Sequence, residues 1–175
     1  GFEVGFWGAY TFSNNTQNSD ELDAWLSYTY SIENSISISA IVTDYYFPNA
    51  GTRIGNFNNY DDLDGAGAHT LEVGISVGGA ESFPLTLSGY VNVYNDAGNN
   101  TYFQLDYPFT VSDVNLNFQV GATSGSKDNP AYYNTDTFNV INVGLTAAKE
   151  VKITDDYSLP VFVSYILNPR VEMSY

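Results

Sequence analysis

The sequence contains no cysteine, only five Lys or Arg residues and a single histidine. Without cysteine, neither disulfides nor thiolate metal sites are available. Twenty acidic residues bring the formal net charge to −15, which argues against a nucleic-acid partner because such partners require a basic surface. Charged residues make up only 14% of the chain, compared with roughly a quarter in ordinary globular proteins. No apolar run approaches the roughly 18 residues that a transmembrane helix needs, and no signal peptide is visible.

Aromatic residues are abundant instead, with 15 Tyr and 11 Phe, and many lie where apolar and polar residues alternate. Such alternation is typical of β-strands that have one apolar and one polar face. It predicts nine strands, at about 2–12, 21–32, 35–47, 69–79, 84–94, 101–109, 113–123, 137–149 and 158–168, and a tenth that begins at Val171. No segment has a convincing helical period, and residues 1–175 are expected to form one all-β domain.

The connections between the predicted strands alternate, with little exception, between long and short. Polar loops follow the strands that end near residues 12, 47, 94 and 123, whereas IENS, GAES and TVS are brief turns. A meander with long loops at one end and short turns at the other is typical of a transmembrane barrel. A soluble Greek-key sandwich has no reason to alternate in this way. The sequence therefore predicts an antiparallel, up-and-down transmembrane β-barrel.

The two faces of the predicted strands differ in an unusual way. The apolar face has runs of residues such as Leu26, Ile38, Val73 and Ile141, and no charged residue interrupts those runs. The polar face is mostly Ser, Thr, Asn and Gln, without Lys or Arg, whereas the outside of a soluble barrel is normally rich in charge. This composition suits an apolar face toward lipid and a polar face toward a wet lumen. Aromatic residues near the strand ends fit interfacial girdles, although Tyr and Phe are also good strand formers.

Six residues are the candidates for facing the lumen. They are Glu3, Asp23, Trp25, Glu72, Tyr90 and Asp106. If the lumen conducts, acids without nearby bases favour cations; the alternative is a structural network in which Ser, Thr, Asn and Tyr bond to the acids. Trp7 and Tyr94 are expected to help Trp25 and Tyr90 narrow the lumen.

Other chemistry is weakly supported. His69 lies at the start of a strand beside the longest loop, where a solvated histidine is expected. The acids Asp61, Asp62 and Asp64 precede Gly65 and resemble part of a calcium loop, but the chelating Glu of an EF-hand is missing, which favours a solvated acidic loop. No catalytic residues, enzyme activity or cofactor are expected.

Several stretches also resemble the TorF-like family of outer-membrane porins, in the versions found in Bacteroidota-type bacteria. They are FEVGFWGAYTFSN, ELDAWLSYTYSI, VTDYYFPNAG, YFQLDYPFTVSDVNLNFQVGAT and FNVINVGLTAAKEVKITDDYSLPVFVSYILNP. They occur in the family's order and cover most of the chain. The resemblance implies a Gram-negative outer-membrane β-barrel and supplies no catalytic or binding residues.

Members of that family usually have further strands before the GFEVGFWG segment and a final strand that ends in an aromatic residue. We therefore expect an incomplete chain, with about twelve strands in the full barrel and nine or ten in this sequence. The expected function is that of a passive porin for small solutes, with a polar, mildly acidic lumen. It would lie in outer-membrane lipid and lipopolysaccharide, with other outer-membrane proteins as further candidate partners. A non-conducting accessory barrel of a larger complex and a soluble secreted β-sandwich or adhesin are the alternatives.

Overall fold

A computed structural model describes residues 1–11, 20–33, 35–48, 53–57 and 67–174 of the chain. These residues form a single antiparallel sheet of ten strands. The strands are β1 (Phe2–Ala9), β2 (Glu21–Ser31), β3 (Ser37–Tyr46), β4 (His69–Gly78), β5 (Thr86–Tyr94), β6 (Thr101–Val111), β7 (Val114–Thr123), β8 (Asn139–Lys152), β9 (Ser158–Asn168) and β10 (Met173–Ser174). The all-β prediction is confirmed, and each predicted strand is present within a few residues of its expected bounds.

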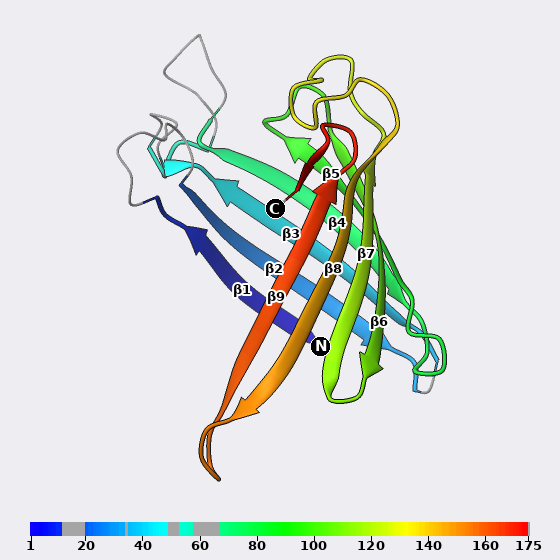
Figure 1. Cartoon of the computed structure of the whole chain (residues 1–175). Helices are drawn as coiled ribbons and strands as arrows, with labels where there is room; N and C mark the ends of the chain where they lie inside the picture. The colour runs from blue at the N-terminus through cyan, green and yellow to red at the C-terminus, as the bar shows by residue number, and fades with distance from the viewer. Residues whose placement is uncertain (12–19, 34, 49–52, 58–66, 175) are drawn as a thin grey trace.

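The strands follow one another in the sheet in sequence order, from β1 to β10. Every neighbouring pair is antiparallel, so the topology is up-and-down, as predicted. The sheet curls strongly, and β8 and β9 cross in front of β1 and β2 in Figure 1. It is not closed: in the described part of the chain, β1 and β10 are the two ends of the strand order. The barrel expectation is thus met only as a curled, open sheet.

The strand registers place the apolar residues in continuous rows across the sheet. One row runs from β1 to β7 through Phe2, Tyr28, Ala40, Ile75, Gly89, Phe103 and Ala122. A second runs from β2 to β9 through Tyr30, Ile38, Val77, Leu87, Leu105, Val120, Val143 and Leu167. We call the face that carries these rows the outer face, and the opposite one the inner face.

Burial on these two faces is the reverse of that in a soluble protein. On β2, the outer residues Leu26 and Tyr28 are 50% and 45% exposed, whereas Ser27 and Thr29, on the inner face, are half-buried. The buried hydrophobic residues among those described are only Ala68 and Ile141. Eight of the described polar residues are buried, and the three of them that lie within the strands on the inner face are Thr43, Asn92 and Thr123. The polar face therefore forms the interior of the curled sheet.

Two irregularities in strand pairing change the faces expected for two residues. The register shifts between Leu71 and Glu72, so that Leu71 pairs with Tyr94 while Glu72 pairs with Asn92. Because one residue of β5 is skipped, Tyr94 moves to the outer face, and its expected place in the lumen is wrong. A second shift, between Gly121 and Ala122, leaves Ile141 out of the pairing; Ile141 is buried, although alternation assigned it to the lipid-facing row.

The connections lie at two ends of the sheet. Those after β5 and β7 are at one end, and the turns after β4, β6 and β8 are at the other (Figure 1). Among the described residues, none belongs to a helix with the length and apolar character that a membrane crossing requires.

Candidate functional site

The inner face lines an open cavity of about 610 Å³. Its walls come from β2 to β6, from β8, from the end of β9, and from the loop between β7 and β8. Four of the six predicted lumen residues line it, namely Asp23, Trp25, Glu72 and Tyr90. The other two, Glu3 and Asp106, lie on the inner face outside the cavity wall. Trp7, which pairs with Asp23, also lies on the inner face but is not part of the cavity wall.

Glu3 and Asp106 have partners within the sheet. Glu3 accepts a hydrogen bond from the indole Nε1 of Trp25 at 3.2 Å. Asp106 accepts bonds from the side-chain amides of Gln104 at 2.7 Å and Asn117 at 2.9 Å. Asp106 has a neutral donor at each of its two oxygens and Glu3 has one at Oε1, so both carboxylates fit the structural-network interpretation of the inner-face acids.

Three aromatic rings of the inner face lie against glycines of neighbouring strands. Ideal Cβ atoms at Gly5, Gly74 and Gly121 would stand 2.0 Å from Trp25, 2.3 Å from Tyr90 and 2.1 Å from Tyr102, respectively. A side chain at any of these positions would displace the ring that covers it. The glycines thus let Trp25, Tyr90 and Tyr102 lie close to the wall of the cavity that all three line.

The acidic part of the cavity wall comes from β2 and β4. The hydroxyl of Tyr45 donates a hydrogen bond to Oε1 of Glu72 at 2.9 Å. Oδ1 of Asp23 is buried and has no hydrogen-bond partner among the described residues, and the same is true of Oδ1 of Asn142. The cavity therefore presents acceptor oxygens, aromatic rings and carboxylates together.

Several cavity residues were missed from the sequence. Tyr45, Tyr102 and Asn142 occupy inner-face positions that alternation did supply, but nothing in the sequence set them apart from other polar-face residues. Tyr133 comes from the loop after β7, where no periodic pattern exists. Tyr133 packs against Tyr102, with ring centroids 6.1 Å apart. Burial raises the pKa of Tyr133, and the nearby Tyr132 hydroxyl and Glu72 carboxylate raise it further. The hydroxyl of Tyr133 is therefore neutral.

A second polar cluster joins two of the loops at the same end of the sheet. The carboxylate of Asp96 accepts hydrogen bonds from the side chains of Asn92 at 2.9 Å, Asn100 at 3.0 Å and Asn129 at 3.0 Å. The backbone N–H groups of Gly98 and Asn100 donate to it as well, at 3.0 and 2.8 Å. Burial disfavours the charged form, but the hydrogen bonds outweigh it and lower the pKa of Asp96 to about 2. Asp96 therefore stays ionised and ties the β5–β6 loop to the loop that carries Tyr133.

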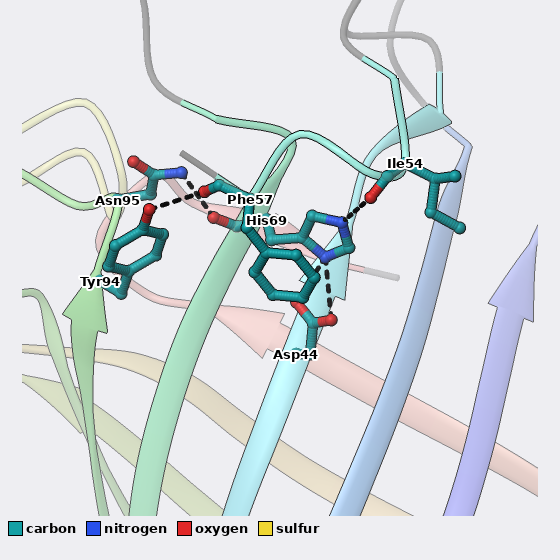
Figure 2. Close-up of polar contacts among 6 residues, drawn as sticks. All are labelled: Asp44, Ile54, Phe57, His69, Tyr94 and Asn95. Carbon is teal, nitrogen blue, oxygen red and sulfur yellow. Dashed lines mark hydrogen bonds and ion pairs between the residues drawn. The ribbon is translucent and has the colours of Figure 1, made fainter. Parts of the chain in front are cut away.

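His69 is buried, with only 4% of its surface exposed, so the expectation of a solvated histidine is wrong. Figure 2 shows its ring between Asp44 of β3 and the backbone of Ile54. Nδ1 lies 2.8 Å from both carboxylate oxygens of Asp44, and Nε2 lies 2.5 Å from the carbonyl oxygen of Ile54. Phe57 stacks on the ring with a centroid distance of 3.8 Å.

Two further hydrogen bonds hold the 53–57 segment and His69 in place. Tyr94 donates to the carbonyl of Phe57 at 2.7 Å, and the side chain of Asn95 donates to the carbonyl of His69 at 2.7 Å (Figure 2). His69 follows the apolar parity of β4, and Asp44 lies on the same face at the end of β3. This cluster therefore anchors a loop to the rim of the outer face and contributes nothing to the cavity.

The weak calcium candidates Asp61, Asp62 and Asp64 lie outside the described residues. Within the described part of the chain, no group of three or more His, Cys, Asp or Glu side chains is arranged to hold a metal ion.

Comparisons with protein families, with curated proteins and with solved structures give no match to this chain. What the fold defines is a class: an antiparallel, up-and-down sheet with an apolar outer face and a polar, cavity-bearing inner face. The resemblance to the TorF-like porins stays a prediction.

Proposed function

We propose that the chain forms the wall of an outer-membrane β-barrel that acts as a passive channel for small solutes, as the TorF-like resemblance implies. In this proposal the outer face meets lipid and the inner face lines the lumen. The edge strands β1 and β10 each pair with a neighbouring strand, so that the barrel is closed. Pairing of the edges is required because the membrane interior offers no water to their free backbone groups. The observation that carries the proposal is the reversed burial of the two faces.

The size of the exposed apolar face supports a lipid environment. The nine longer strands at about 4.8 Å spacing, with apolar rows over about 25 Å of their length, present roughly 1,000 Å². The largest apolar patch on a soluble monomer is typically about 300–600 Å². The strands also have suitable lengths, since β2, β6 and β9 each have 11 residues and a membrane-spanning strand needs about 9–11.

The aromatic residues of the outer face support the same orientation. Near the short turns, Phe2 lies 4.8 Å from Tyr28, and Phe83 lies 6.2 Å from Tyr107, measured between ring centroids. All four are exposed. Exposed aromatic rings close to the turns correspond to the girdle that membrane barrels place at the level of the lipid headgroups.

A non-conducting accessory barrel is the second candidate. The observation that favours it is the position of Tyr133, which reaches the cavity from a loop tied down by Asp96 and narrows the path through the interior. A soluble β-sandwich or adhesin is less well supported, because it would leave the apolar rows in contact with water.

Current through the protein in a planar bilayer separates the two candidates. We expect discrete conductance steps with a preference for cations, because the cavity wall carries Asp23 and Glu72 and no Lys or Arg. Asp23→Asn and Glu72→Gln should shift the reversal potential toward that of an unselective pore, whereas Glu81→Gln, in the exposed turn after β4, should leave it unchanged. Absence of conductance from folded protein would favour the accessory barrel.

A further inference from the structure

We infer that the inner cavity is a binding site for a small organic cation, such as a quaternary ammonium. This inference deepens the proposed channel function, on which it rests, by naming the class of solute that the lumen takes. It is based on the shape of the cavity, its aromatic walls and the sign of its charge.

The aromatic walls have the geometry that attracts cations. Tyr90 lies against Gly74 and Tyr102 against Gly121, so both rings pack on the sheet while they also line the cavity. Trp25 has the same relation to Gly5. The face of an aromatic ring carries partial negative charge and binds ammonium and guanidinium groups within about 6 Å. Tyr133 adds a ring from the loop side, stacked at 6.1 Å on Tyr102.

The charge in the cavity has one sign. Asp23 and Glu72 line it, and no Lys or Arg is among its lining residues. Glu72 has unused capacity to accept a hydrogen bond from a ligand, because it receives a bond from Tyr45 at only one oxygen, Oε1. A cationic group would supply the missing positive charge, and a hydroxyl or N–H elsewhere on the same ligand, such as the hydroxyl of choline, would supply the donor.

The ligand is better matched by an organic cation than by a metal ion or a neutral sugar. A hard metal ion requires a close cage of oxygen atoms, and the described residues contain no group of three candidate side chains for one. A sugar would stack on the same rings but would leave the two carboxylates without a counter-charge. A cavity of about 610 Å³ also falls in the range of about 300–1,000 Å³ that small organic ligands occupy.

Calorimetric titration of the refolded protein in detergent micelles, at constant ionic strength, tests the inference with a matched pair of ligands. Choline is the probe, and 3,3-dimethylbutan-1-ol, which replaces its nitrogen by carbon, is the neutral control. We expect choline to bind about tenfold or more tightly than the alcohol, since cation–π contacts and two carboxylates act only on the charged ligand.

The variants locate the site. Glu72→Gln and Tyr102→Leu should each weaken choline binding about three- to thirtyfold. Tyr102→Phe, which keeps the ring, should weaken it less than Tyr102→Leu does, and Glu81→Gln, which removes a carboxylate far from the cavity, should leave it unchanged. Circular dichroism of each variant confirms that its sheet is intact. Equal affinity for the alcohol, no heat from choline, or choline binding unaffected by both cavity variants would each overturn the inference.

Bilayer conductance keeps this inference separate from the channel proposal. A conducting protein that does not bind choline would retain the channel and remove the site. A protein that binds choline through Glu72 and Tyr102 but carries no current would retain the site and remove the channel.

Discussion

At the residue scale, the interior of this protein is organised around carboxylates held by neutral donors. Asp106 is bound by two amide side chains, and Asp96 by three asparagine side chains and two backbone N–H groups. No Lys or Arg is needed in either case, which explains how a chain with a formal charge of −15 keeps acids in its interior. Ionised carboxylates with several good donors are stabilised in the charged form.

The Asp96 cluster predicts a pH dependence of stability. Its pKa is about 2 in the folded protein and about 3.9 in an unfolded chain. Asp96 therefore contributes stability that is fully present above about pH 4 and is lost as the pH falls toward 2. Asp96→Asn, which puts an amide among amide donors, should lower the free energy of unfolding by roughly 1–3 kcal/mol at pH 6.

Urea unfolding of the lipid-bound protein at pH 6 and at pH 2.5 provides the measurement. The difference in the free energy of unfolding between the native protein and Asp96→Asn should shrink at the lower pH, because Asp96 of the unfolded chain is protonated at pH 2.5 while that of the folded protein is still mostly ionised. Asp128→Asn, at an exposed residue of the neighbouring loop, is the control and should behave like the native protein at both values. If the difference in the free energy of unfolding is the same at pH 2.5 as at pH 6, Asp96 does not act through its charge.

At the element scale, the strands themselves were predictable because alternation is a local property of the sequence. The sequence predicted all ten strands, their neighbours and, for most positions, the face on which each side chain lies. Pairing irregularities were not predictable, since the shift at Leu71 and Glu72 depends on how β4 and β5 meet. For that reason Tyr94 and Ile141 were assigned to the wrong faces. The role of Tyr133 and the burial of His69 depend on loop conformations, which carry no periodic signal.

Neighbouring residues of one strand provide a matched test of the two faces. Leu26 lies on the outer face and Ser27 on the inner face of β2, opposite Val4 and Glu3 of β1. Leu26→Lys should destabilise the protein in lipid vesicles by about 2–4 kcal/mol if the residue lies near the middle of the bilayer. Ser27→Lys places the same charge beside Glu3 in the wet interior and should cost less than about 1 kcal/mol.

The free energy of unfolding of both variants in the same vesicles gives the comparison. Similar losses for the two lysines would indicate that both faces of β2 are packed against protein. A larger loss for Ser27→Lys would place the core on the inner face, as in a soluble sandwich.

At the scale of the whole molecule, the account depends on a sheet that is apolar outside and polar inside. The apolar rows cross nine strands without interruption by charge, and the interior holds a cavity with two acids and several aromatic rings. This distribution supports a membrane barrel more strongly than either the strand count or the loop lengths do. The residues of each face match the medium that the face would meet, lipid outside and water inside.

The central claim, that lipid covers the outer face, is tested most directly by spin labels. The chain has no cysteine, so one introduced thiol can be labelled at a time. The sites are Leu26→Cys, Ile75→Cys and Leu105→Cys on the outer face, and Ser27→Cys, Ser76→Cys and Gln104→Cys on the inner face. In vesicles, labels on the outer face should collide preferentially with dissolved oxygen, and labels on the inner face with a water-soluble nickel chelate. Equal or greater access of the nickel chelate to the outer-face labels would contradict the account.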